Sequence, residues 1–241
     1  MLVGGALSDR SAAVAVAALL AEHFTVFAYD RRGRGDSGDT PPYAVQREIE
    51  DIEALVTEAG GSASLFGHSS GAALALRAVI HGLPIERLAL YEPPFIVDDS
   101  RPPVPDDYVE HLDELVAEGR RGDAVAYFMT VAVGMPPDMV ADMRSGEMWP
   151  YLEAVAHTIS YDGRIMEGTI GGRPIPAKRW ASVKIPTLVM DGGESPAWQH
   201  TAVRELVDAL PDASHLTLEG QTHGPADDVL VPVLVEFFTQ T

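Results

Sequence analysis

Short apolar runs rich in β-branched and aromatic residues recur along the chain, and each has the length of a buried strand. They lie at residues 25–29, 64–66, 88–91, 187–190 and 215–218. Between most of them, as in residues 45–56 and 203–210, apolar positions repeat with the spacing of an amphipathic helix. This alternation predicts an α/β fold: a doubly wound, mostly parallel sheet whose ligand site lies at the carboxyl ends of the strands.

The alternation stops between residues 94 and 185, where proline-rich loops separate helical patterns. Four helices are predicted there, over residues 106–119, 122–133, 137–145 and 148–157. We interpret this segment as a helical cap inserted into a single domain whose core comprises residues 1–93 and 186–241.

The cap carries a stripe of methionine and aromatic side chains that predicts a partly exposed apolar pocket lining. The stripe consists of Phe128, Met129, Met135, Met139, Met143, Met148, Trp149 and Tyr151. A small apolar molecule is therefore the expected partner.

Composition narrows the function classes. The net charge of -19 would repel nucleic acid and an anionic membrane surface. The absence of cysteine excludes disulfides, a thiol nucleophile and thiolate metal sites, and it suits a cytoplasmic protein. The apolar run 11–21 is too short to span a bilayer and is predicted to be a buried helix. We expect no membrane partner and no metal.

The strongest chemical signal is the sequence Gly67-His68-Ser69-Ser70-Gly71, a G-x-S-x-G motif. It directly follows a predicted strand and precedes a helical run over residues 72–80. Such a turn needs small residues around a strained serine and places its hydroxyl at a helix N-terminus, where an oxyanion is also stabilised. Ser69 is the predicted nucleophile.

A serine hydroxyl needs a base, and His223 is the natural candidate. It lies in a loop after the last predicted strand and before the terminal helix, residues 227–239. The other histidines lie in predicted helices or away from strand-end loops. His68, beside the nucleophile, is expected to point away from the hydroxyl.

Together these motifs resemble the α/β-hydrolase superfamily over nearly the whole chain. Residues 3–6 (VGGA) look like its first oxyanion loop, and residues 29–37 (YDRRGRGDS) look like its turn after the next strand. The resemblance implies that the backbone N–H groups of Ala6 and Ser70 form the oxyanion hole and that no cofactor is required.

The triad acid departs from the usual pattern. The position that commonly holds it is Ser195, which cannot carry a negative charge. Some superfamily members, haloalkane dehalogenases among them, take the acid from the end of the preceding strand, where Glu92 stands. Glu92 is the preferred candidate, and Asp191 and Glu194 remain open alternatives.

The glycines Gly33, Gly35 and Gly38 match the dinucleotide fingerprint, but a proline pair follows where a helix would have to begin. We therefore interpret this segment as a rigid turn whose arginines are tied to nearby carboxylates.

The chain begins close to the oxyanion loop, with residues 1–3 as a strand expected in the sheet interior. The superfamily generally has two further strands before this one, so either the start of the sequence is misassigned or the chain has lost a hairpin. In the second case the strand over residues 25–29 is an open edge, which suggests marginal stability or a homodimer formed through that edge.

The sequence thus predicts a serine hydrolase that cleaves a small or medium apolar ester, thioester or lactone through an acyl-enzyme. The alternative is a binding protein or receptor of the same fold that does not hydrolyse its ligand, which the missing acid at Ser195 favours.

Overall fold

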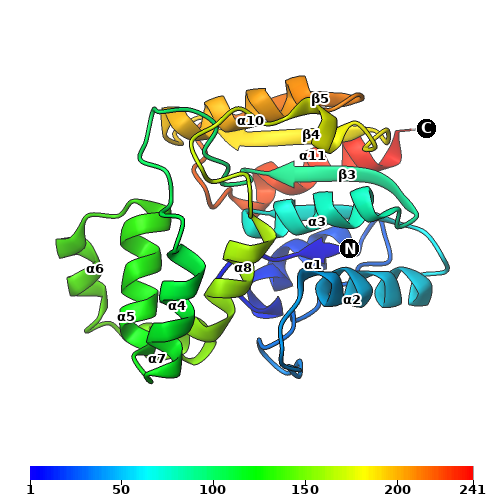
Figure 1. Cartoon of the computed structure of the whole chain (residues 1–241). Coiled ribbons are helices and arrows are strands. Elements are labelled where there is room, and N and C mark those ends of the chain that lie inside the picture. The colour runs from blue at the N-terminus through cyan, green and yellow to red at the C-terminus, as the bar shows by residue number, and fades with distance from the viewer. Residues whose placement is uncertain (241) are drawn as a thin grey trace.

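The computed structural model describes residues 1–240. These residues form a parallel sheet with the strand order β1-β2-β3-β4-β5 (Figure 1). The strands are β1 (Leu2–Val3), β2 (Ala63–His68), β3 (Ile85–Tyr91), β4 (Thr187–Gly192) and β5 (Ala213–Leu218). Because neighbouring strands are parallel, helices cross over between them. The predicted α/β class is confirmed.

The segment 25–29 is shorter as a strand than the pattern predicts. Only Ala28 pairs with the sheet, through an isolated parallel bridge to Leu2, and the Leu2 N–H donates to the Phe27 carbonyl at 2.8 Å. The prediction of a strand over this whole segment is wrong, because β1 offers it only two residues for pairing. As expected, β1 itself lies in the sheet interior, between this bridge and β2.

Helices cover both faces of the sheet. On one face lie α2 (Val45–Glu58), α3 (Ser70–His81) and α10 (Ala197–Ala209), and on the other α1 (Val14–Leu20) and α11 (Asp227–Thr239). Successive strand residues alternate between these two cores: Leu65 and Val189 belong to the first, whereas Phe66 and Met190 belong to the second. This period of two explains why the strands read as continuous apolar runs.

The apolar run 11–21 is helical, but it is buried on one side only. It starts as a short 3-10 helix, η1 (Arg10–Ala13), and continues as α1. Leu20 is the one buried residue of α1, whereas Val14 and Leu19 are 61% and 40% exposed. The predicted helix is present, but the expectation that it is buried is wrong except at Leu20. Across residues 1–240, no helix has the length and apolar character needed to cross a membrane.

A group of helices between β3 and β4 lies beside the sheet (Figure 1). It comprises α4 (Tyr108–Ala117), α5 (Arg121–Tyr127), η2 (Phe128–Val133), α6 (Pro137–Met143), α7 (Trp149–Val155), η3 (Ala156–Thr158) and α8 (Ile159–Ile165), and α9 (Ala177–Trp180) follows. We refer to α4 through α8 as the helical group. It has a hydrophobic cluster of its own, which includes Leu112, Val125 and Trp149.

The four helices predicted in this segment are present. The first, third and fourth are shorter than predicted, and the second is divided. After Tyr127 the α-helical turn widens into the π-helix η2, which ends at Val133 and is followed by Gly134 with φ +84°. Helix α8 was not predicted from the sequence. It packs between α4 and α3 and so connects the helical group to the sheet layer.

Candidate active site

Ser69 lies in the sharp turn between β2 and α3. Its backbone has φ +57° and ψ −127°, a conformation that non-glycine residues rarely adopt. Gly71 lets this turn approach β1, because a Cβ atom there would lie 2.2 Å from the Val3 carbonyl oxygen. The tight turn therefore presents Ser69 at the carboxyl end of the sheet, at the N-terminus of α3.

His223 is joined to Glu92. Its Nδ1 lies 2.6 Å from Glu92 Oε2, and the other carboxylate oxygen accepts the Gly192 N–H at 2.8 Å. Glu92 is fully buried at the end of β3 and also has a positive φ, +43°. Burial raises the pKa of Glu92, but the hydrogen bonds from His223 and Gly192 outweigh it and hold that pKa below its ordinary value.

The two alternative acids lie elsewhere. Asp191 is fully buried and pairs with His200 Nδ1 at 2.7 Å and with His215 Nε2 at 3.1 Å. Glu194 is exposed. Of the three carboxylates considered, the structure brings only Glu92 to His223.

Two side chains that the sequence analysis did not select hold the loop that carries His223. The Tyr91 hydroxyl donates to the Thr222 carbonyl at 2.5 Å, and His68 Nε2 donates to the His223 carbonyl at 2.7 Å. Burial and the neighbouring His223 lower the pKa of His68 to about 4, which keeps its ring neutral. The ring of His68 lies against that of His223, with centroids 4.8 Å apart. That it points away from the Ser69 hydroxyl stays a prediction.

The loop over residues 4–8 lies against Ser69. A Cβ atom on Gly5 would lie 2.9 Å from Ser69 Cβ, so only glycine fits there. Leu7, in the same loop, has φ +55°. Among residues 1–240, the non-glycine residues with positive φ are Leu7, Ser69 and Glu92. The strained backbone of this protein is therefore concentrated around one site.

A cavity of about 560 Å³ lies at this site. Ser69, His223, Ala6 and Ser70 all line it. In the part of the chain that the structure describes, no hydrogen bond joins Ser69 to His223; such contacts often tighten only when substrate binds.

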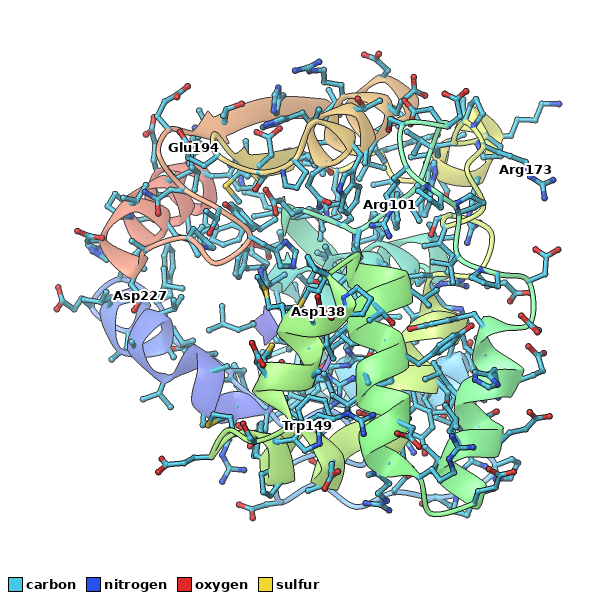
Figure 2. The ribbon with its side chains drawn as sticks, turned by 90° about the vertical axis from the view of Figure 1, so that its left-hand side faces the viewer. Arg101, Asp138, Trp149, Arg173, Glu194 and Asp227 are labelled. Carbon is cyan, nitrogen blue, oxygen red and sulfur yellow. The ribbon has the colours of Figure 1, made fainter. Side chains whose placement is uncertain are left out.

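Most of the cavity wall is apolar. It includes Phe66, Ile96, Val104, Phe128, Val133 and Leu230. Besides Glu92, the carboxylates along the wall are Asp9 and Asp227, and none of the described lining residues is lysine or arginine. Figure 2 shows Asp227 where α11 begins, beside α1.

The predicted methionine and aromatic stripe contributes less to this wall than expected. Only Phe128 of the stripe lines the cavity. Met129 and Trp149 are buried within the hydrophobic cluster of the helical group, and Met139 and Met148 are 52% and 64% exposed. The stripe therefore mainly builds the interior of the helical group.

The sequence profile of the alpha/beta hydrolase family matches residues 2–230. The chain belongs to this family. A solved alpha/beta hydrolase from Sphaerobacter thermophilus is 62% identical to it, with a TM-score of 0.91 over 99% of this chain and 91% of that one.

Two more distant matches to the present chain are named as hydrolases. The N-formylmaleamate deformylase of Pseudomonas putida is 38% identical over 98 residues, which are 39% of this chain and only 37% of the deformylase. The enol-lactonase of Burkholderia xenovorans is 24% identical with a TM-score of 0.71 over 99% of this chain and 90% of that one, which shows a shared fold. The family match supports a hydrolase.

The turn after residue 28 of this alpha/beta hydrolase is held by ion pairs, as predicted for its arginines. Arg32 donates to both Asp51 oxygens, at 2.8 and 2.9 Å. Arg31 donates to both Glu48 oxygens at 2.8 Å, and Arg34 pairs with the buried Asp162. Because α2 begins only at residue 45, no helix starts at the third glycine of the apparent dinucleotide fingerprint.

The arrangement has the elements of a proton-transfer relay. A proton on His223 Nδ1, donated to the ionised Glu92, leaves Nε2 as the ring's proton acceptor. The N–H of Ser70 is at the first turn of α3 and has no partner within the helix, so it can stabilise an anion beside Ser69.

Proposed function

We propose that the protein is a serine hydrolase that cleaves a small or medium apolar ester, thioester or lactone through an acyl-enzyme. The observation that carries this proposal is the 2.6 Å contact between His223 Nδ1 and the buried Glu92 carboxylate, with Ser69 on the same cavity. A histidine oriented by a carboxylate next to a strained serine is the arrangement that activates a hydroxyl.

In the first step, Ser69 Oγ attacks the substrate carbonyl carbon while His223 Nε2 takes the hydroxyl proton. Glu92 stabilises the resulting imidazolium, and the N–H groups of Ala6 and Ser70 stabilise the negative oxygen. His223 then returns its proton to the leaving oxygen or sulfur as the carbonyl reforms, which releases an alcohol or thiol.

In the second step, water replaces the leaving group. His223 removes a proton from water, whose oxygen attacks the acyl carbon, and then protonates Ser69 Oγ as the acid departs. The reaction consumes one water and regenerates the enzyme. Every proton is carried by His223, so the scheme requires no metal or organic cofactor.

The cavity supports an uncharged substrate. Its wall is mainly apolar, and the carboxylates of Asp9 and Asp227, for which residues 1–240 provide no salt bridge, would repel an anion. The deformylase relative is named for N-formylmaleamate, an anion. We therefore propose that this protein differs from that relative in the charge of the substrate that it accepts.

The first test is turnover of p-nitrophenyl acetate and butyrate by the wild type and by Ser69→Ala. Turnover that disappears with the serine, together with fluorophosphonate labelling of the wild type only, supports the serine hydrolase. A folded wild type that neither hydrolyses the esters nor reacts with the fluorophosphonate would refute it and favour the ligand-binding alternative.

A further inference from the structure

A buried arginine that the proposed reaction does not use contacts the loop over residues 4–8. Arg34 is 1% exposed, and its Nη1 donates to the Gly5 carbonyl oxygen at 2.5 Å. The Ser8 hydroxyl donates to the same oxygen at 2.8 Å. One carbonyl of this loop thus accepts two hydrogen bonds, one of them from a cation.

The Gly5 carbonyl and the Ala6 N–H belong to the same planar peptide unit. Donors held on the carbonyl oxygen therefore fix the direction in which the Ala6 N–H points. They also polarise the unit, because electron density drawn toward the oxygen makes the N–H a stronger donor. The next residue, Leu7, has φ +55°, so the loop needs contacts from outside to keep its shape.

The helical group holds Arg34 from the opposite side. Asp162 of α8 accepts from Arg34 Nη2 at 2.6 Å, and Thr158 Oγ1 lies 3.1 Å from Arg34 Nε. The second oxygen of Asp162 accepts from Arg31 at 2.7 Å, and the same Arg31 nitrogen lies 3.2 Å from the Gly4 carbonyl oxygen. One carboxylate of the helical group thereby fixes two arginines against successive carbonyls of the loop.

We propose that Arg34 and Ser8 are positioning residues that aim the Ala6 N–H at the developing oxyanion, with Asp162 as the anchor of Arg34. This inference rests on the proposed function, because it assumes that Ala6 binds the oxyanion. Loss of either positioning residue then weakens binding of the tetrahedral state and leaves binding of the ground state unchanged.

The test compares Ser8→Ala and Arg34→Lys with the wild type. The kinetic readout is kcat and KM for p-nitrophenyl butyrate. The binding readout is a matched pair of inhibitors: pentyl trifluoromethyl ketone, to whose carbonyl carbon Ser69 Oγ adds to form a tetrahedral oxyanion, and the corresponding alcohol, which forms no adduct.

Ser8→Ala is expected to lower kcat roughly tenfold and to raise the inhibition constant of the ketone by the same factor. The inhibition constant of the alcohol is expected to stay unchanged. Arg34→Lys keeps the positive charge but not the planar guanidinium, and we expect a loss of roughly a hundredfold in the same two quantities. Arg32→Gln is the matched control, because Arg32 belongs to the same turn but pairs with Asp51. It is expected to keep wild-type values.

The inference is overturned if the variants weaken binding of the ketone and of the alcohol by equal factors, or if they weaken binding of neither inhibitor. If Arg34→Lys does not fold, as judged by its melting transition, Ser8→Ala decides alone. A wild type that lacks ester turnover and forms no adduct with the ketone refutes the proposed function instead, so the two failures are distinguishable.

Discussion

Replacement of Glu92 by glutamine changes one carboxylate oxygen to an NH2 group and preserves the size of the side chain. In the wild type both oxygens accept hydrogen bonds, from His223 Nδ1 at 2.6 Å and from the Gly192 N–H at 2.8 Å. A glutamine can satisfy only one of these donors, because its NH2 group must face the other. The variant is therefore mismatched in either amide orientation.

The magnitude follows from this mismatch and from the lost charge. An NH2 group facing His223 drives its ring proton to Nε2, which then cannot accept the Ser69 proton. We expect kcat to fall roughly a thousandfold to ten-thousandfold, which is about 4–5.5 kcal/mol of transition-state stabilisation. The unsatisfied buried donor is expected to lower the free energy of unfolding by about 1–3 kcal/mol.

The stability part of this prediction depends on pH. The pKa of Glu92 lies below its ordinary value in the folded protein, despite burial, because of its hydrogen bonds. Its contribution to stability is therefore fully present above the unfolded-state pKa and is lost as the pH falls through the folded-state pKa. The difference in unfolding free energy between wild type and Glu92→Gln is expected to be largest near neutral pH and to shrink in acid.

Steady-state kinetics with p-nitrophenyl butyrate and urea unfolding measure these two effects. Asp191→Asn is the control, because Asp191 pairs with His200 and His215 rather than with His223. If Glu92→Gln keeps more than a tenth of the wild-type kcat, or if Asp191→Asn loses more activity than Glu92→Gln, the assignment of Glu92 as the acid is refuted.

Three further predictions concern the surroundings of the site. Folding lowers the pKa of His68 from 6.5 to about 4, so as the pH falls the unfolded state binds a proton at this ring before the folded state does. In urea unfolding, the wild type is therefore expected to lose more stability than His68→Gln as the pH falls from 6.5 to about 4. Asp227→Asn is expected to raise kcat/KM for p-nitrophenyl hemisuccinate relative to the butyrate by roughly two- to threefold, whereas Asp208→Asn, exposed on α10, should not; equal ratios contradict the charge argument. Gly71→Ala is expected to cost about 2 kcal/mol or more, because its Cβ would lie 2.2 Å from the Val3 carbonyl oxygen; an unchanged melting temperature would show that α3 can shift instead.

The local parts of the site could be predicted from the sequence. Ser69 and His223 lie in short segments whose strand, turn and helix signals agree with each other, and the structure has both segments as expected. The acid could be narrowed only to three carboxylates, because the pairing of Glu92 with His223 joins residues that are 131 positions apart. The positive φ that turns Glu92 at the end of β3 has no signature in residue type.

The missed features depend on tertiary contacts. Helix α8 is seven residues long and includes a glycine and the buried Asp162, so its periodicity is weak. Its position is specified by the arginines that it meets. The methionine and aromatic stripe of the helical group did not predict the cavity wall. Periodicity indicates that one side of a helix is buried, but it does not indicate which part of the protein covers that side. Residues 25–29 have strand composition but too short a neighbour to pair with.

The bridge made by Asp162 limits how freely the helical group could be exchanged between relatives. A transplanted segment without a carboxylate at this place would leave Arg31 and Arg34, both nearly inaccessible to solvent, with one acidic partner fewer. Uncompensated charge in a protein interior costs about 3–5 kcal/mol, a large share of the stability of a domain. The helical group is therefore less independent of the rest of the domain than its insertion between two strands suggests. A recombinant protein that receives this segment from a relative must keep a carboxylate at the position of Asp162.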